Sequence, residues 1–148
     1  MAQGYSTFPT YLEGTFTPTV TLVGGAGNTT PVYSTNTGRY TRIGNRVLVD
    51  IYLTGDGGAE GAGTGVLNIA LPITASASHP DGIFTGGSVI NSTEEIICYG
   101  VIAGSATTVA LKMQADTAGA VTSDIVDVTG ADQNNATRSI RLKFFYEV

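Results

Sequence analysis

The chain contains few of the residues from which disulfide frameworks and many enzyme sites are built. Its 148 residues include no tryptophan, one cysteine and one histidine. A single cysteine cannot form an internal disulfide, and Cys98 lies among apolar neighbours, which predicts a buried, inert core thiol. His79 precedes Pro80-Asp81-Gly82, a context typical of a turn, and no Ser/His/acid set can be assembled around it. We therefore name no catalytic residue, metal ligand or cofactor, and expect no enzyme.

Charged side chains are also scarce. They make up 13% of the chain, about half the usual share for a soluble domain, and their net charge is −5. An acidic protein is poorly suited to neutralising phosphates, so we expect no nucleic-acid partner. Arg138, Arg141 and Lys143 gather near the C-terminus in an alternating segment, where we expect them to mark a solvent or partner face.

Long apolar runs are missing as well. No segment approaches the length needed to span a bilayer, so we expect no membrane association. The first residues, MAQGY, have neither the basic nor the apolar region of a signal peptide. The protein is therefore expected to be made in a cytoplasm.

What the chain does have is glycine and short alternating segments. Twenty glycines and abundant threonine take the place of strong helix formers, while 42% of the residues are hydrophobic, enough for a core. The clearest segment is a hairpin, with Arg39–Ile43 and Arg46–Leu53 joined at Gly44-Asn45. In its second strand one face consists of apolar residues, namely Val47, Val49, Ile51 and Leu53.

Further strands are predicted from the same alternation. They cover residues 14–23, 32–34, 66–73, 82–90, 95–102, 107–113, 121–129 and 138–148. We expect a bulge at Gly86-Gly87, a strand covered on both faces at 95–102, and an edge or bulge position at Pro18. Eight or nine short strands separated by glycine turns are the pattern of a sandwich, jelly roll or barrel. Of these we predict an all-β, antiparallel β-sandwich of jelly-roll type, forming one domain from 14 to 148.

The last strand presents two different faces. Ile140, Leu142, Phe144 and Tyr146 alternate with polar residues and are expected to face the core. Phe145 is then exposed, and with Arg141 and Lys143 on the same side we predict a subunit interface there. Cyclic closure, here a homotrimer, is the common solution for such a face.

Two segments outside the strands have alternative interpretations. The glycine-rich stretch 55–65 lacks the lysine of a phosphate loop and the carboxylates of a calcium loop, so a surface loop is favoured. Residues 1–13 form either a loose tail or an extended N-terminal arm that docks on a partner. The arm is favoured by its aromatic and apolar residues around a proline, which are the candidate contacts: Tyr5, Phe8, Pro9, Tyr11 and Leu12.

The hairpin carries a resemblance to a known class of protein. Its pattern Gly-x-Tyr-Thr-x-Ile-Gly-Asn-x-Val-x-Val (38–49), preceded by Gly-Thr-Phe-Thr-Pro-Thr (14–19), resembles a module of tailed-phage virion proteins. Such modules occur in capsid decoration proteins and in fibre tips. The resemblance implies a cement protein that binds the major capsid protein on the outer surface of the virion.

The alternative that the resemblance implies is the receptor-binding tip of a tail or head fibre, with a host receptor as its partner. The chain is short, begins at Met1 and has no fibrous shaft before the module, which favours the decoration protein.

Overall fold

The computed structural model describes residues 10–55, 61–78, 82–91, 94–114, 125–134 and 137–148, and within them most residues lie in β-strands, with one short 3-10 helix. The elements are β1 (Tyr11–Phe16), β2 (Val20–Val23), β3 (Tyr33–Ile43), β4 (Arg46–Gly55), β5 (Val66–Ala70), β6 (Gly82–Asn91), β7 (Glu94–Ile102), β8 (Thr108–Gln114), β9 (Ile125–Asp127), the 3-10 helix η1 (Ala131–Gln133) and β10 (Ser139–Glu147). All named strand pairs are antiparallel, which confirms the all-β, antiparallel part of the predicted fold class. No helix in these ranges is long and apolar enough to cross a membrane.

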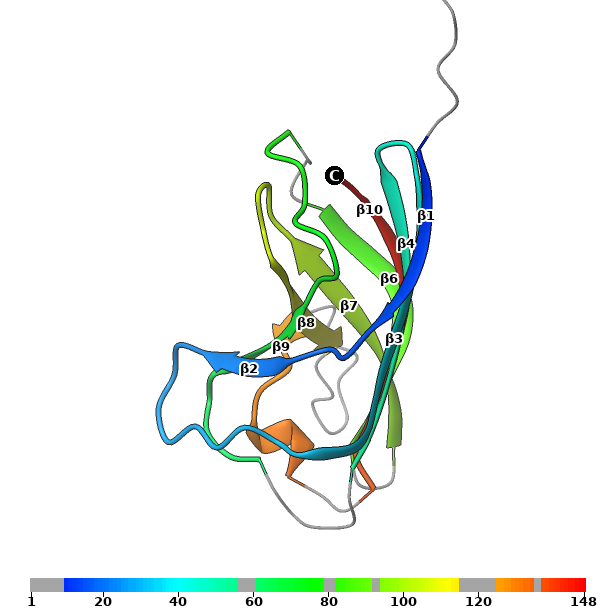
Figure 1. Ribbon diagram of the computed structural model, residues 1–148. Helices are drawn as coiled ribbons and strands as arrows, with labels where there is room; N and C mark the ends of the chain where they lie inside the picture. The colour runs from blue at the N-terminus through cyan, green and yellow to red at the C-terminus, as the bar shows by residue number, and fades with distance from the viewer. Residues whose placement is uncertain (1–9, 56–60, 79–81, 92–93, 115–124, 135–136) are drawn as a thin grey trace, which may run out of the picture.

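The strands form one curled sheet. Their order is β1-β3-β4-β10-β6-β7-β8-β5-β2, with β9 paired to β8. Figure 1 shows β3, β4 and β10 forming one wall of the curl while β8 and β9 lie in the wall opposite. The predicted jelly-roll sandwich is not confirmed, because hydrogen-bonded ladders run from one wall to the other without a break.

The central hairpin is confirmed. β3 and β4 pair from Ile43↔Arg46 at the turn to Tyr33↔Gly55 at the far end. Gly44 has φ 61°, as required at the first central position of a type II′ turn, which matches the twist of the flanking strands. The same turn holds the start of β1, since the Gly44 amide donates to the Thr10 carbonyl at 2.8 Å.

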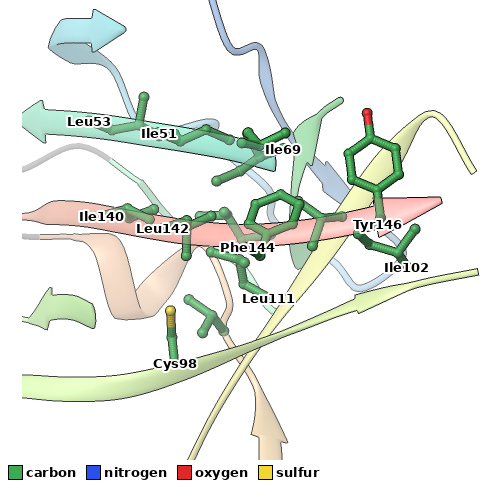
Figure 2. Close-up of a cluster of buried hydrophobic side chains, with 14 of the residues drawn as sticks. Ile51, Leu53, Ile69, Cys98, Ile102, Leu111, Ile140, Leu142, Phe144 and Tyr146 are labelled. Atoms are coloured by element: carbon green, nitrogen blue, oxygen red, sulfur yellow. The ribbon is translucent and has the colours of Figure 1, made fainter. Parts of the chain in front are cut away.

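The core fills the inside of the curl. The alternating apolar residues of β4 and β10 are buried in one cluster with Cys98 and Ile102 of β7 and Leu111 of β8 (Figure 2). Phe144 is 4% exposed and Phe145 is 64% exposed, as alternation in the last strand predicts. β10 lies between β4 and β6, so the C-terminal strand is central to the sheet.

Two glycines and two aromatic rings interlock on the inward side of β1 and β3. Gly14 pairs with Tyr40, and Phe16 pairs with Gly38. A Cβ on Gly38 would lie 2.3 Å from the Phe16 ring, and one on Gly14 would lie 2.8 Å from the Tyr40 ring. The two rings meet edge to face at 6.4 Å between centroids. The glycines and aromatics of the phage-like pattern thus have a packing role in attaching the edge strand.

The segment 14–23 is not one strand, as predicted, but two strands at opposite ends of the sheet order. β1 ends at Phe16 and pairs with β3, while β2 begins at Val20 and pairs with β5. Pro18, buried between them, cannot donate to a ladder, and the chain crosses there from one edge to the other. The Pro18 carbonyl accepts a hydrogen bond from the Asn36 side-chain amide at 2.6 Å.

Two further predictions about strand faces are wrong. In β7, Cys98 is buried but Ile97 is 61% exposed, so this strand is not covered on both faces. Arg138 is fully buried rather than on the solvent face with Arg141 and Lys143. Arg138 lies just before β10, two residues from Ile140 and four from Leu142, so the alternation of the strand places its side chain on the same inward face. There its Nε donates to the Val32 carbonyl at 3.1 Å.

A bulge does occur at the predicted place. The register of β6 against β7 shifts between Thr85 and Gly87. Gly87 lies close to β10, where a Cβ would be 2.4 Å from the Arg141 carbonyl oxygen. The glycine pair therefore serves both the bulge and a close approach of two backbones.

Burial suppresses ionisation of two core groups. Desolvation raises the pKa of the Cys98 thiol from 9.0 to about 12 and that of Tyr146 from 10.0 to about 12. The Tyr146 hydroxyl donates to the Ile73 carbonyl at 2.6 Å and accepts from the Ile73 amide at 3.3 Å. The prediction of an inert, buried Cys98 agrees with this geometry.

These shifts predict that stability falls in alkaline solution. The unfolded thiol ionises near pH 9.0 while the folded thiol stays neutral up to about pH 12, so its contribution is complete below pH 9 and is lost as the pH rises toward 12. We expect the urea midpoint to fall between about pH 8 and about pH 11, and to fall less steeply in Cys98→Ala. A midpoint that stays level over this range in the wild type would contradict the assignment.

Candidate functional site

The outward face of β1, β3, β4 and β10 carries the most distinctive exposed side chains of the described chain. Residues paired directly across neighbouring strands point to the same face, so the registers define rows of neighbours. Counting from the hairpin turn, three of these rows are Tyr11–Ile43–Arg46–Glu147, then Glu13–Thr41–Leu48–Phe145, then Thr15–Arg39–Asp50–Lys143. A fourth row is Thr37–Tyr52–Arg141–Ser88.

The first two rows contain an apolar patch, which we define as Tyr11, Ile43, Leu48 and Phe145. Their exposed fractions are 61%, 54%, 44% and 64%. A shallow hollow of about 380 Å³ lies within the patch and is lined by Thr41, Ile43, Arg46, Leu48 and Phe145. Large apolar side chains gathered in this way on a rigid sheet are typical of an interface.

Two polar groups border the patch. The Arg46 guanidinium lies 5.9 Å from the centre of the Phe145 ring, a distance suited to a cation–π contact. The Tyr11 hydroxyl donates to the Glu13 carboxylate at 2.8 Å, which raises the pKa of Tyr11. These contacts hold two exposed rings in place and so reduce the entropy lost when a partner covers them.

The next two rows form a polar hollow beside the patch, defined by Asp50, Tyr52, Ser88, Arg141 and Lys143. Its volume is about 440 Å³, and backbone near Ile51, Gly87 and Leu142 completes the lining. The Arg141 guanidinium lies 5.2 Å from the centre of the Tyr52 ring. A smaller hollow of about 200 Å³, lined by Thr37, Arg39, Asp50 and Tyr52, adjoins it.

The structure separates the residues predicted for the subunit interface. Phe145 belongs to the apolar patch, whereas Arg141 and Lys143 line the polar hollow on the same outward face.

Of the predicted arm contacts, Tyr11 and Leu12 belong to β1, so the edge strand begins inside the segment 1–13 that was assigned to the arm. Tyr11 joins the patch, and Leu12 pairs with Arg42 on the opposite face. Tyr5, Phe8 and Pro9 lie outside the described residues.

Several residues of this surface were not singled out from the sequence. Alternation places Leu48, Asp50 and Tyr52 on the polar side of the hairpin's second strand, which is where they lie. What the sequence could not supply was their neighbours, because Phe145, Lys143 and Arg141 come from a strand almost a hundred residues later. Ile43, next to the turn, was counted only as part of the hairpin.

In the described ranges, no group of three or more His, Cys, Asp or Glu is arranged to hold a metal ion. His79 and the middle of the glycine-rich stretch, 56–60, lie outside those ranges. The class defined by fold and surface is an all-β antiparallel domain whose outward face carries an exposed apolar patch and a polar hollow.

Comparison with known proteins adds no relative: no family model, curated protein or solved structure matches the chain.

Proposed function

We propose that the protein is a phage capsid decoration (cement) protein, not an enzyme, that binds the outer head surface as a homotrimer. The resemblance of the hairpin to virion modules supports the location, and the apolar patch is the observation that carries the binding role. In this proposal the partners are the major capsid protein and two further copies of the chain. The protein is made in the host cytoplasm and assembles onto the virion.

The mechanism is passive. The sheet presents Ile43, Leu48 and Phe145 without the cost of ordering a loop. Burying them contributes about 25 cal/mol per Å² of apolar area, and the part that exceeds the cost of association stabilises the complex. A subunit that covers the junction of two capsomers adds this free energy to their contact. The assembled shell then resists the outward pressure of packaged DNA.

The N-terminal arm extends this surface in the proposal. The carbonyl of Thr10 is held by Gly44 at the hairpin turn, so residues 1–9 connect to the molecule next to the patch. Tyr5, Phe8 and Pro9 can then contact a neighbouring subunit or capsomer as an added segment. Because β1 begins at Tyr11, a truncation that tests the arm should stop at residue 9.

A second candidate function is the receptor-binding tip of a tail or head fibre. The polar hollow favours it, since a recess lined by charged, hydroxyl and aromatic side chains suits recognition of a host surface. In that case a host receptor replaces the capsid as the principal partner.

The experiment is an add-back assay on virions that lack their own copy. Leu48→Asp/Phe145→Asp should abolish decoration or weaken it by at least about 100-fold, because it places two charges in a desolvated contact. Ile97→Asp is the control, since Ile97 is 61% exposed on the same outward face but lies on β7, opposite Ser88 and outside the patch. Normal decoration by the double variant would rule out the patch, and label confined to the tail would favour the fibre.

Trimerisation is tested separately by sedimentation of the purified chain. We expect the wild type to sediment as a trimer at micromolar concentration rather than as a 15.2 kDa monomer. A wild-type monomer would contradict self-association.

Deletion of residues 2–9 should leave the fold intact and reduce decoration of virions. Unchanged decoration would show that the arm does not contribute to capsid binding.

A further inference from the structure

The polar hollow and the smaller hollow adjoin each other across β3, β4, β10 and β6, and we call the pair the groove. Tyr52 and Asp50 line both recesses, so they stand between them. The larger recess is bordered by Arg141 and Lys143 of β10, and the smaller one by Arg39 of β3. The groove is thus two adjoining sites that share an aromatic ring and a carboxylate.

The charge of this groove is opposite to that of the chain. Arg39, Arg141 and Lys143 surround a single carboxylate, Asp50, so the local sum is three minus one, or +2, in a chain of net charge −5. Asp50 pairs with Arg39 on one side and with Lys143 on the other, so cations flank it on both neighbouring strands. This excess of positive charge selects for an anionic ligand.

The mixture of cationic, carboxylate and aromatic groups in the groove limits the class of ligand further. The two cations of the larger recess can together bind one carboxylate, and the cation of the smaller recess can bind a second. The planar Arg141 guanidinium can bind its carboxylate through two hydrogen bonds. The exposed Asp50 carboxylate can accept hydrogen bonds from hydroxyl or N–H donors that lie between those carboxylates, while the Tyr52 ring offers an apolar surface. A chain of acidic sugar units supplies carboxylates, hydroxyl donors and apolar C–H faces in close succession. An acidic peptide brings more carboxylates to Asp50 and fewer donors.

We propose that this groove binds an acidic oligosaccharide, a linear chain of uronic acid units. Arg141 and Lys143 hold the carboxylate of one unit, and Arg39 holds that of the next. Asp50 accepts hydrogen bonds from sugar hydroxyls, Tyr52 contacts a sugar face, and Ser88 and Thr37 supply hydroxyls at the two ends. This assignment does not depend on the capsid role, because the apolar patch is separate from the groove.

The test is calorimetric titration of the purified full chain with trigalacturonate. Its fully methyl-esterified form is the matched ligand control, since esterification of the carboxylates removes the charge and leaves the sugar rings and their hydroxyls. We expect saturable binding of the acid, at least about tenfold weaker binding of the ester, and weakening of acid binding with added salt.

The protein variants form a matched set. Arg141→Gln and Tyr52→Ala should each weaken trigalacturonate binding by about tenfold or more, whereas Arg46→Gln should not change it. Arg46 is the suitable control because it also lies over an exposed aromatic ring, at 5.9 Å compared with 5.2 Å for Arg141, but outside the groove. Unchanged thermal melting confirms that each variant is folded.

Three results would overturn the proposal. One is the absence of trigalacturonate binding at up to about 10 mM. Another is equal loss in Arg46→Gln and Arg141→Gln, which would indicate general charge attraction. The third is that hexaglutamate binds as tightly as the sugar, which would indicate a site for acidic peptides. Virion decoration by Arg141→Gln, measured alongside, distinguishes failure of the groove from failure of the capsid role.

Discussion

Phe144→Ala should lower the free energy of unfolding by about 3–5 kcal/mol, whereas Phe145→Ala should change it by less than about 0.5 kcal/mol. The two residues are neighbours in β10 and are identical in type, so they differ only in environment. Phe144 is 4% exposed and packs next to Tyr146, at 6.1 Å between ring centroids. Phe145 is 64% exposed on the outward face.

The measurement is urea denaturation at a protein concentration low enough to keep the chain monomeric. Self-association would otherwise add to apparent stability, and Phe145 belongs to the surface proposed for it. We expect Phe144→Ala to shift the midpoint and Phe145→Ala to leave it unchanged. Equal effects of the two substitutions would mean that β10 does not present these faces to core and solvent.

Alternation along the chain was sufficient to predict the local parts of the fold. The hairpin around Gly44-Asn45 and the inward face of β10 depend on near neighbours and on a period of two, which the sequence displays directly. The bulge next to Gly87 was also readable, because paired glycines inside a strand pattern indicate one.

Non-local pairing was not predictable from the same signals. β1 and β2 are separated by three residues yet lie at opposite ends of the sheet order, because Pro18 interrupts the ladder and the sheet curls around the core. Arg138 was wrongly predicted to face solvent or a partner, because the prediction followed its charge and not its position in the alternation of the strand. It lies 5.6 Å from the centre of the Tyr33 ring, a contact that depends on chain folding over about a hundred residues.

The binding face shows the same division between local and non-local information. Phe145, Arg141 and Lys143 were placed outward from alternation alone. The groove could not be predicted without the register of β10 against β4 and β6, which places Arg141 beside Tyr52 and Ser88. A shift of one residue would turn all of these side chains to the other face, so the surface is as well specified as the core behind it.

Gly87→Ala should be among the most destabilising single-methyl additions in the described chain, lowering the free energy of unfolding by about 2–4 kcal/mol. The added Cβ would lie 2.4 Å from the Arg141 carbonyl oxygen, 2.5 Å from a Leu142 methyl and 2.9 Å from the Cys98 sulfur. A side chain can rotate away from such a contact, but the carbonyl belongs to the central strand β10. Relief therefore requires β6 and β10 to move apart where Leu142 pairs with Gly87.

Urea denaturation and amide hydrogen exchange together test this expectation. In Gly87→Ala, protection should fall at β10 residues that pair with β6, while the β3–β4 hairpin should keep its protection except through the global loss. Ser88→Ala is the matched control, because Ser88 follows directly in β6 but points outward, and it should change stability by less than about 0.5 kcal/mol. A Gly87→Ala protein as stable as the control would show that β6 does not approach β10 this closely. The lining of the proposed sugar groove at Gly87 would then be wrong as well.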